Sequence, residues 1–403
     1  MRRPLLPVSD ALARLLAGAE PTGVERVPIA EAAGRVLTTS IKALRTQPPF
    51  DASAMDGYAV RAEDVATVPA RLSVIGAAPA GQRFAGKLGP GQAVRIFTGA
   101  PVPEGADAVV LQEDTTAPVG GHVEILESVA AGRHIRRAGL DFAEGDDLLE
   151  ARRVLDPAAI SLAAAANHPS LEIFKKPLVA ILATGDELLP PGSEPGPDQI
   201  IASNSYGVAA IARDWGADIL DLGIAPDDRA AIASAVRRAL DTGADILVTL
   251  GGASVGEHDL VREVLTGEGM ALDFWKIAMR PGKPLMFGRF RKMRALGLPG
   301  NPVSSLVGSH IFLAPLVARL AAREHAPDIR EARLGKAMDE NDTREDYVRA
   351  FVERDAGGLV ATPFDIQDSS MLTNLARANG FIIRKPFSPA VVPGDPCRVM
   401  MVR

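Results

Sequence analysis

Residues 246–259 read I-L-V-T-L-G-G-A-S-V-G-E-H-D, and this stretch decides the fold. Its run of apolar and β-branched residues predicts a strand that is buried on both faces, as in a parallel sheet. Two glycines follow directly, and the spacing of Leu260, Val261, Val264 and Leu265 then predicts a helix. Parallel α/β sheets bind ligands at the carboxyl ends of their strands, where glycines admit a ligand to the backbone and helix N-termini favour anions. The stretch is therefore either a ligand-binding loop or a tight turn with solvated acids.

The same order of strand, loop and helix repeats across residues 176–326, which predicts a parallel α/β sheet with helices on both faces. Strands are expected at 178–183, 218–222, 246–250, 274–279 and 295–298. If these strands are parallel, the loops that follow them open at one edge of the sheet.

The predicted edge carries both acids and bases. The loops contain Asp186, Glu187, Asp227, Asp228, Glu257 and Asp259 together with Lys276, Arg280 and Lys283. Bases and backbone N–H groups bind oxyanions, whereas carboxylates bind Mg²⁺. The edge therefore favours a phosphate ligand with a divalent cation, and hydrolysis or transfer at phosphate as the reaction.

The remaining chain predicts three further domains. Short strands at 71–76, 93–97, 108–112 and 123–126 are typical of a small β domain. A helix capped by Ser9 and a second short helix over 30–37 precede it, and Asp156 followed by Pro157 starts another helix after it. Beyond residue 327 we expect a small β domain with a hairpin over 353–360 and a capped helix over 368–380.

The predicted fold class is therefore a multidomain α/β plus β protein. A helical and extended domain is assigned to 1–45 and 143–175, an inserted β domain to 46–142, the α/β domain to 176–326 and a C-terminal β domain to 327–403. The loop at 47–60 carries Asp56 and is either an ordered loop that enters a cleft or a solvated turn.

Composition limits the classes of function and the cellular locations that we expect for the chain. The 403 residues carry a formal net charge of −6 with mixed signs, so no nucleic-acid footprint is visible. Cys397 is the single cysteine, which excludes an internal disulfide and fits a reducing cytoplasm. The N-terminus lacks the apolar core of a signal peptide, and no uninterrupted apolar segment is long enough to predict a membrane span.

Several other chemistries fit the motifs poorly. The glycine loop lacks the lysine of a P-loop, and no G-x-G-x-x-G opens the first strand–helix unit. The histidines show no zinc spacing, and Ser254 does not stand in a G-x-S-x-G elbow. We read His258 as an exposed residue of the first helical turn.

Six ordered motifs resemble one known family. They are S-A-M-D-G-Y-A at 53–59, F-T-G-A-P-V-P-E-G-A-D-A-V-V at 97–110, T-G-D-E-L at 184–188, G-G-A-S-V-G-E-H-D at 251–259, F-W-K-I-A-M-R-P-G-K-P at 274–284 and G-L-P-G-N-P-V-S at 297–304. Together with a weaker D-S-S match near Ser369, they resemble the MoeA family of molybdopterin molybdenumtransferases, which includes the E domain of gephyrin.

The resemblance implies an architecture and an activity. It implies four domains per subunit, a molybdopterin-binding fold for the α/β domain, and an elongated homodimer. The active cleft would lie between the α/β domain of one subunit and the β domain of the other. The family takes adenylylated molybdopterin and molybdate, releases AMP with Mg²⁺ present, and leaves molybdenum on the dithiolene. The motifs fit molybdate and tungstate equally, because both are tetrahedral dianions.

Site residues follow from the resemblance motif by motif. The active-site residues would be Asp56, Thr98, Asp141, Glu187, Asp259 and Lys276, joined by Asp227 or Asp228. An oxyanion pocket for molybdate would be lined by Arg280, Lys283, Arg349 and Ser370. As a mechanistic hypothesis, Asp259, Glu187 and a second acid such as Asp227 bind Mg²⁺. Lys276 and the loop of Gly251, Gly252 and Ser254 then stabilise charge on the adenylyl phosphate, and Asp56 enters from the neighbouring subunit.

Three positions depart from the family pattern. Arg280 stands where lysine is common, which keeps the charge but changes a point-like group into a forked one. Leu140 replaces a common glutamate next to Asp141, and Ala253 replaces a valine in the glycine loop.

Two alternative functions remain open. One is the upstream molybdopterin adenylyltransferase, whose fold resembles the α/β domain, and the other is a scaffold protein like gephyrin. The expected partners are small-molecule substrates and a second copy of the chain, with the adenylyltransferase, molybdoenzymes or their chaperones as further candidates. Neither nucleic acid nor a membrane is expected.

Overall fold

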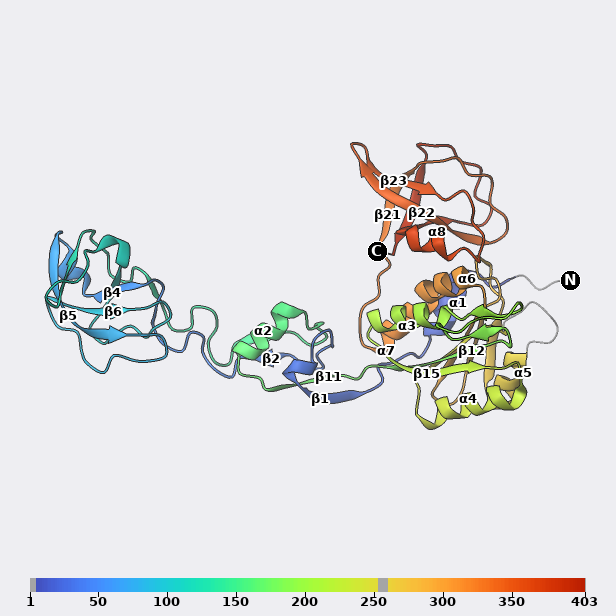
Figure 1. Cartoon of the computed structure of the whole chain (residues 1–403), viewed down its shortest axis with the longest axis horizontal. Helices are drawn as coiled ribbons and strands as arrows, with labels where there is room; N and C mark the ends of the chain where they lie inside the picture. Colours follow the sequence, from blue (N-terminus) through green and yellow to red (C-terminus); the bar gives the residue numbers. More distant parts are fainter. Residues whose placement is uncertain (1–4, 253–259, 403) are drawn as a thin grey trace. The chain divides into compact units, whose positions relative to one another are not determined.

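The computed structural model describes residues 5–252 and 260–402 (Figure 1). The chain forms two compact units. Unit 1 comprises Met1–Glu25, Gly34–Thr38 and Glu172–Arg403, and unit 2 comprises Arg26–Ala33 and Thr39–Leu171. Strands β1 (Val24–Pro28) and β11 (Ser170–Phe174) contain two of the points at which the chain passes from one unit to the other.

A six-stranded sheet forms the centre of unit 1. Its strands are β15 (Asp218–Ala225), β12 (Leu178–Thr184), β16 (Ile246–Leu250), β20 (Arg294–Leu298), β19 (Met286–Arg289) and β17 (Ala271–Trp275), in that order. The first four are parallel neighbours, whereas β19 is antiparallel to both β20 and β17. Strand β17 consequently runs in the same direction as the first four, so the five predicted loops do open at one edge.

The fourth predicted strand has different bounds from those expected. Strand β17 ends at Trp275, and residues Met279–Arg280 form β18, which pairs with β22 in another sheet. The physical reason lies at Lys276, whose φ of 90° is incompatible with an extended strand.

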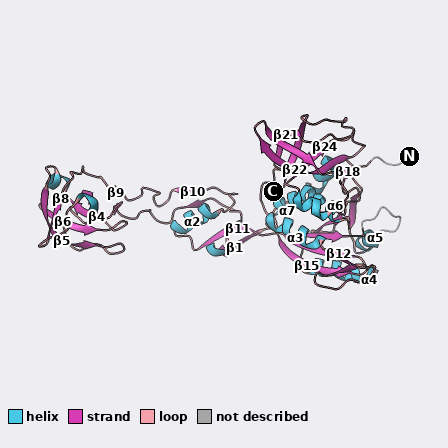
Figure 2. Cartoon of the chain, turned by 45° about the horizontal axis from the view of Figure 1, so that its top comes forward, coloured by secondary structure: helices cyan, strands magenta, loops and turns pink. Residues whose placement is uncertain are grey.

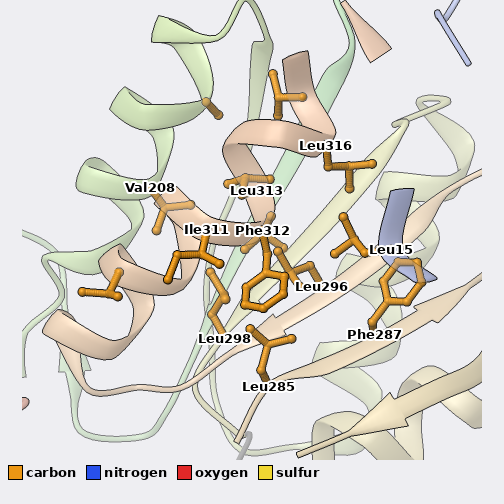
Figure 3. Packing of buried hydrophobic residues seen from close by; sticks show 14 of the residues in the cluster. Leu15, Val208, Leu285, Phe287, Leu296, Leu298, Ile311, Phe312, Leu313 and Leu316 are labelled. Carbon is orange, nitrogen blue, oxygen red and sulfur yellow. The ribbon is translucent and has the colours of Figure 1, made fainter. Parts of the chain in front are cut away.

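Helices cover both faces of this sheet (Figure 1). One face packs against α4 (Arg229–Asp241) and α5 (Leu260–Gly267). The other packs against α3 (Asn204–Asp214) and a long helix made of α6 (Pro302–Gly308), a π-helical segment (Ser309–Leu313) and α7 (Ala314–Leu320). Figure 3 shows Phe312 and Leu313 of this helix beside Leu296 and Leu298 of β20. Strands β13 (Leu188–Leu189) and β14 (Ile200–Ile201) form a small parallel pair.

The long helix is also apolar enough to span a membrane by length and composition. However, 83% of its most apolar window is buried inside the protein. Phe312, Leu313, Leu316 and Val317 are fully buried in the core. We therefore interpret Pro302–Leu320 as the core helix of the α/β domain.

The N-terminal helix α1 (Val8–Leu16) packs into the same core, although the sequence analysis assigned it to the helical and extended domain. Its buried face is Val8, Ala11 and Leu15, and Figure 3 shows Leu15 near Phe287. Ser9 lies inside the helix and does not cap it, because Pro7 occupies the N-cap position. The predicted capping role of Ser9 is therefore wrong.

The C-terminal domain is a closed five-stranded β barrel (Figure 2). Its strands are β22 (Glu345–Asp355), β23 (Gly358–Pro363), β21 (Ile329–Leu334), β25 (Pro396–Met401) and β24 (Gly380–Arg384), and β24 pairs back with β22. The predicted hairpin is confirmed by β22 and β23. Helix α8 (Leu372–Arg377) starts later than predicted, because Asp368 binds Ser370 and leaves the N-cap position to Met371.

Unit 2 contains the predicted β domain. A five-stranded sheet has the order β7 (Ala108–Leu111), β4 (Gly57–Val60), β6 (Gln92–Ile96), β5 (Ala70–Ala78) and β8 (His122–Ile125). Unit 2 also contains two small pairs, β2 (Ile41–Lys42) with β10 (Asp147–Leu149) and β3 (Ala52–Ser53) with β9 (Ile135–Arg136). Asp156 caps α2 (Pro157–Ala165), as predicted, by accepting the Ala159 N–H. The short helix predicted over 30–37 is wrong, since a single 3₁₀ turn (Ile29–Glu31) replaces it.

Candidate functional site

A cavity of about 880 Å³ lies at the carboxyl edge of the parallel strands in unit 1. Four strand ends contribute to it: Thr184 at the end of β12, Asp227 after β15, Gly251 after β16, and the segment 299–301 after β20. Glu187, Gly252 and Ser370 also line the cavity. The structure thus brings together side chains that are more than 180 residues apart in the sequence, counted from Thr184 to Ser370.

Three helices begin at this cavity. Asn204 opens α3, Leu260 opens α5, and Asn301 precedes the first residue of α6. The first N–H groups of a helix lack intrahelical partners and carry partial positive charge. Asn204 and Asn301 fix their loops, because the Asn204 amide donates to the Gly300 carbonyl at 2.7 Å and the Asn301 amide to Ser369 Oγ at 2.7 Å. The cavity is therefore suited to an anionic ligand.

Two glycines are required where β16 ends. Gly251 has φ of 99°, and a Cβ there would lie 2.5 Å from the Thr184 carbonyl oxygen. Gly252 has φ of 66°, and a Cβ there would lie 2.1 Å from Val261 Cγ2. Only glycine fits both the left-handed backbone and the close approach of strand and helix. The predicted interpretation of this loop as a place for close backbone approach agrees with that geometry.

Carboxylates also gather at this cavity. The Asp227 N–H donates to Asp186 Oδ1 at 3.0 Å, and Glu187 lies in the same loop as Asp186. Burial raises the pKa of Asp227 above its ordinary value, and the negative charges of Asp186 and Glu187 raise it further. A proton or a bound cation would relieve this repulsion.

The donor set fits a hard cation such as Mg²⁺, which prefers carboxylate oxygens. Glu187 and Asp227 both line the cavity, and Asp186 adjoins them. Within residues 5–252 and 260–402, however, no group of three or more His, Cys, Asp or Glu residues has the geometry to hold a metal ion. The predicted third ligand, Asp259, lies outside the described residues, as does Ser254.

Asp228 has a structural role instead. Its carboxylate accepts the Ala231 N–H at 2.9 Å and caps α4. Asp227, by contrast, lines the cavity. Of the two alternatives left open by the sequence, the geometry favours Asp227 as the site residue.

A buried hydroxyl adds a polar group to the wall of the cavity. Thr184 is 3% exposed, and its Oγ1 has no hydrogen-bond partner among the described residues. A buried polar atom without a partner is unusual, because its desolvation is not compensated. Thr184 Oγ1 is therefore an uncompensated polar atom in the part of the cavity wall that the structure describes.

Lys276 has an unusual local structure. Its φ is 90°, a region that non-glycine residues rarely adopt. Its Nζ lies 3.8 Å from the centre of the Trp275 ring, and the Arg262 guanidinium lies 4.1 Å from the same centre. The aromatic ring thus holds the lysine ammonium by a cation–π contact.

The predicted oxyanion residues do not all line one cavity. Ser370 lines the cavity at the strand ends, whereas Arg280 and Arg349 line a second cavity of about 640 Å³ at the mouth of the barrel. Arg280 donates to Asp346 Oδ2 from Nε at 3.0 Å and from Nη2 at 2.6 Å. Neither cavity lining includes the side chain of Lys283, which lies in the loop between them.

The remaining predicted residues lie in unit 2. The Asp56 carboxylate accepts the Thr98 N–H and the Thr98 Oγ1–H, each at 2.7 Å. These hydrogen bonds lower the pKa of Asp56. Asp141 is exposed, and Arg137 pairs with Asp51 at 2.6 Å instead of with Asp141.

Comparisons with known proteins cover nearly the whole chain. Residues 6–167 match the MoeA N-terminal region (domain I and II), residues 180–319 match a probable molybdopterin binding domain, and residues 331–402 match the MoeA C-terminal region (domain IV). The molybdopterin molybdenumtransferase of Haemophilus influenzae is 36% identical over 370 residues, which cover 90% of each chain. The chain belongs to the MoeA family.

Further relatives agree with this membership. The molybdopterin molybdenumtransferase of Bacillus subtilis is 35% identical over 410 residues, covering 100% of this chain and 95% of that protein. The crystal structure of the MoeA molybdopterin biosynthesis protein of Pyrococcus horikoshii has a TM-score of 0.80 at 31% identity, with 99% of each chain covered. The resemblance stated from the motifs and the predicted fold class are therefore confirmed.

Sequence reasoning missed several residues that line the two cavities of this MoeA protein. Thr184 and Asn301 stood inside quoted motifs but were not singled out, because no pattern tells a buried hydroxyl or a loop amide from a solvated one. Asn204 had a usable signal, since it follows a proline-rich loop and directly precedes a helical pattern. Asn341 and Asp346, which bind Arg280, had no usable signal in the sequence.

Proposed function

We propose that this protein is a molybdopterin molybdenumtransferase that inserts molybdate into adenylylated molybdopterin and releases AMP. The observation that carries the proposal is the cavity at the strand ends. It combines the starts of three helices and the Thr184 hydroxyl, which has no hydrogen-bond partner among residues 5–252 and 260–402, with the carboxylates of Glu187 and Asp227. The relatives that match this sequence over 90% or more of their length are named for the same activity.

Different residues of the chain would have different roles in the proposed reaction. The N–H groups at Gly252 and the helix starts bind phosphate oxygens, because helix N-termini carry partial positive charge. The Gly251 N–H has another role, since it donates to the Leu298 carbonyl at 3.2 Å. Ser370 reaches the same cavity from the segment before α8.

Glu187, Asp227 and Asp259 would hold Mg²⁺, which when bound neutralises negative charge on the phosphoanhydride. The raised pKa of Asp227 supports this assignment, since the crowded carboxylates favour a cation between them. Lys276 supplies a further positive charge, and Lys283 contacts molybdate. Arg349 is 1% exposed and lines the second cavity, so it has no assigned contact in this step.

The proposal extends to assembly and location. As in the expectation from the motifs, two copies of the chain form a homodimer, and Asp56 with Thr98 and Asp141 completes the site of the neighbouring subunit. The product leaves for molybdoenzymes or their chaperones, and the adenylyltransferase delivers the substrate. A cytoplasmic location agrees with the single cysteine.

The two alternatives are less well supported. An adenylyltransferase reading rests on the α/β domain alone, whereas relatives named for molybdenum transfer match over 90% or more of this chain. A scaffold reading requires a binding partner that no observation identifies.

The test supplies purified protein with adenylylated molybdopterin, molybdate and Mg²⁺, and detects the product by activation of a molybdenum-free apo-molybdoenzyme. Activation that requires both molybdate and this protein supports the proposal. A second arm supplies ATP and free molybdopterin instead. Adenylylation in that arm, without activation in the first, would replace the proposal with the adenylyltransferase function.

A further inference from the structure

The segment from Lys276 to Leu285 leaves the α/β sheet and returns to it. The Lys276 N–H donates to the Leu285 carbonyl at 3.1 Å, and the Ile277 N–H to the Lys283 carbonyl at 3.0 Å. These two hydrogen bonds close the base of a loop whose tip contains β18. Both lysines that the proposed reaction uses therefore stand at the base of one loop.

The tip of this loop is bound to the barrel. Met279 and Arg280 pair with Glu345 and Asp346 of β22, and the Glu345 N–H donates to the Ala278 carbonyl at 2.9 Å. Figure 2 shows β18 next to β22. The backbone of the loop is thus part of the barrel's sheet.

The side chain of Arg280 strengthens this attachment. Its Nε and Nη2 both donate to Asp346 Oδ2, and its Nη2 also donates to Asn341 Oδ1 at 3.2 Å. Asp342 lies 3.7 Å from its Nη1. The hydrogen bonds to Asp346, with the negative charges of Asp346 and Asp342, raise the pKa of Arg280. Arg280 is therefore held in one position at the second cavity, which it lines.

The barrel holds the partners of Arg280 firmly. Asn341 is 8% exposed, and its Nδ2 donates to the carbonyls of Arg344, Arg384 and Lys385. The Asp346 side chain is 13% exposed and stands opposite Arg384 in the β22–β24 ladder. Buried, multiply bonded side chains keep a fixed geometry, which makes them suitable anchors.

We propose that Asp346 and Asn341 are positioning residues of the transfer reaction, an inference that rests on the proposed function. They hold Arg280, and Arg280 holds the loop whose base presents Lys276 and Lys283. The left-handed backbone of Lys276 agrees with this role, because a sparsely populated conformation persists only where its surroundings enforce it. The barrel thus contributes to the site by fixing a loop of the neighbouring domain.

The test compares Asp346→Asn with Asp355→Asn. Asp355 is a matched control, because it pairs with Arg333 on the same barrel and lies outside both cavity linings. Hydrogen exchange of residues 276–285 is measured first, and KM for molybdate and kcat are measured next. Asp346→Asn is expected to speed exchange in this segment and to lower kcat/KM by about 10- to 100-fold. Asp355→Asn is expected to change neither.

Further variants keep the result interpretable. Arg280→Lys retains the charge and is expected to recover part of the activity that Arg280→Gln loses. Arg280→Gln serves in place of Asp346→Asn if the latter fails to fold, since Arg280 is 44% exposed at its side chain. Unchanged exchange in 276–285, or faster exchange with unchanged kinetics, would overturn the proposal. If the wild type itself releases no AMP, the proposed function fails while the exchange data still decide whether the loop is anchored.

Discussion

Two adjacent aspartates show how single residues of this protein divide between structure and chemistry. The Asp228 carboxylate accepts a hydrogen bond from the first turn of α4, whereas Asp227 lines the cavity. Neighbouring acids in a P-D-D sequence are indistinguishable by type. Only the start of α4 distinguishes their roles, because the N-cap residue is the one directly before the first helical residue.

The first prediction contrasts Asp227→Asn with Asp228→Ala. Removing the cap is expected to cost about 1 kcal/mol of unfolding free energy and to leave activity per folded molecule near that of the wild type. Asp227→Asn is expected to lower the rate of AMP release about 100-fold, because a charged group of the site is lost. Its melting temperature should stay equal or rise, since repulsion with Asp186 and Glu187 disappears. Thermal unfolding and AMP release measure both effects, and the reverse assignment of the two variants would contradict the geometry.

The second prediction concerns pH. The folded pKa of Asp227 lies above its unfolded value, so this group favours folding only at low pH, and the contribution is lost as pH rises through the folded pKa. Activity needs the ionised carboxylate and therefore falls as pH decreases through the same pKa. Asp186→Asn removes a neighbouring negative charge and should shift the acidic limb of the kcat/KM profile to lower pH. Asp241→Asn, at the end of α4, serves as the control and should leave that limb in place.

At the scale of elements, the site is formed by the strands whose carboxyl ends lie at the same edge of the sheet. Strands β12, β15, β16 and β20 run parallel, so their following loops share an edge although the strands are distant in sequence. Gly251 and Gly252 at the end of β16 admit the close approach of Thr184 and Val261.

The third prediction tests the close approach of Gly252 to Val261. Gly252→Ala combines a left-handed backbone with a Cβ clash against Val261 and is expected to cost about 2 kcal/mol or more. Gly243→Ala is the matched control, because Gly243 has a similar φ of 72° but open space at the Cβ position. It should cost only about 1 kcal/mol from backbone strain. Equal losses in denaturant unfolding of the two variants would contradict the packing argument.

Periodicity predicted most elements of the α/β domain but not its irregularities. Buried strands of five or more apolar residues and the capped helix α4 have strong local signals. The end of β17 at Trp275 does not, because nothing in the residue type of Lys276 announces a φ of 90°. The displaced start of α8 arises from Asp368 binding Ser370, a local hydrogen bond that competes with capping. The sequence predicts a site at a sheet edge that carries acids and glycines. It does not predict the second cavity, because residues of the C-terminal barrel line that cavity.

At the scale of the whole molecule, the central question is how the two units cooperate. Unit 1 holds the cavity and the barrel, and unit 2 holds Asp56 with its partner Thr98. We proposed that unit 2 of one subunit completes the site of the other. Such a shared site makes activity a property of the homodimer.

The fourth prediction tests that sharing by subunit mixing. Asp56→Asn and Asp227→Asn are each expected to be nearly inactive alone. After dissociation, mixing and reassociation, half of the dimers would carry one variant of each kind. One of the two sites in these dimers would then have both native residues, which should restore roughly a quarter of the wild-type activity. If each subunit used its own Asp56, mixing would restore nothing.

The most direct measurement is the amount of AMP released per molybdenum inserted in a single turnover. We predict that the wild-type protein, mixed with adenylylated molybdopterin and Mg²⁺, releases AMP and incorporates molybdenum in a one-to-one ratio when molybdate is present. Asp227→Asn should do neither at a comparable rate. AMP release by the variant at the wild-type rate, or no molybdenum incorporation by the wild type, would contradict the account.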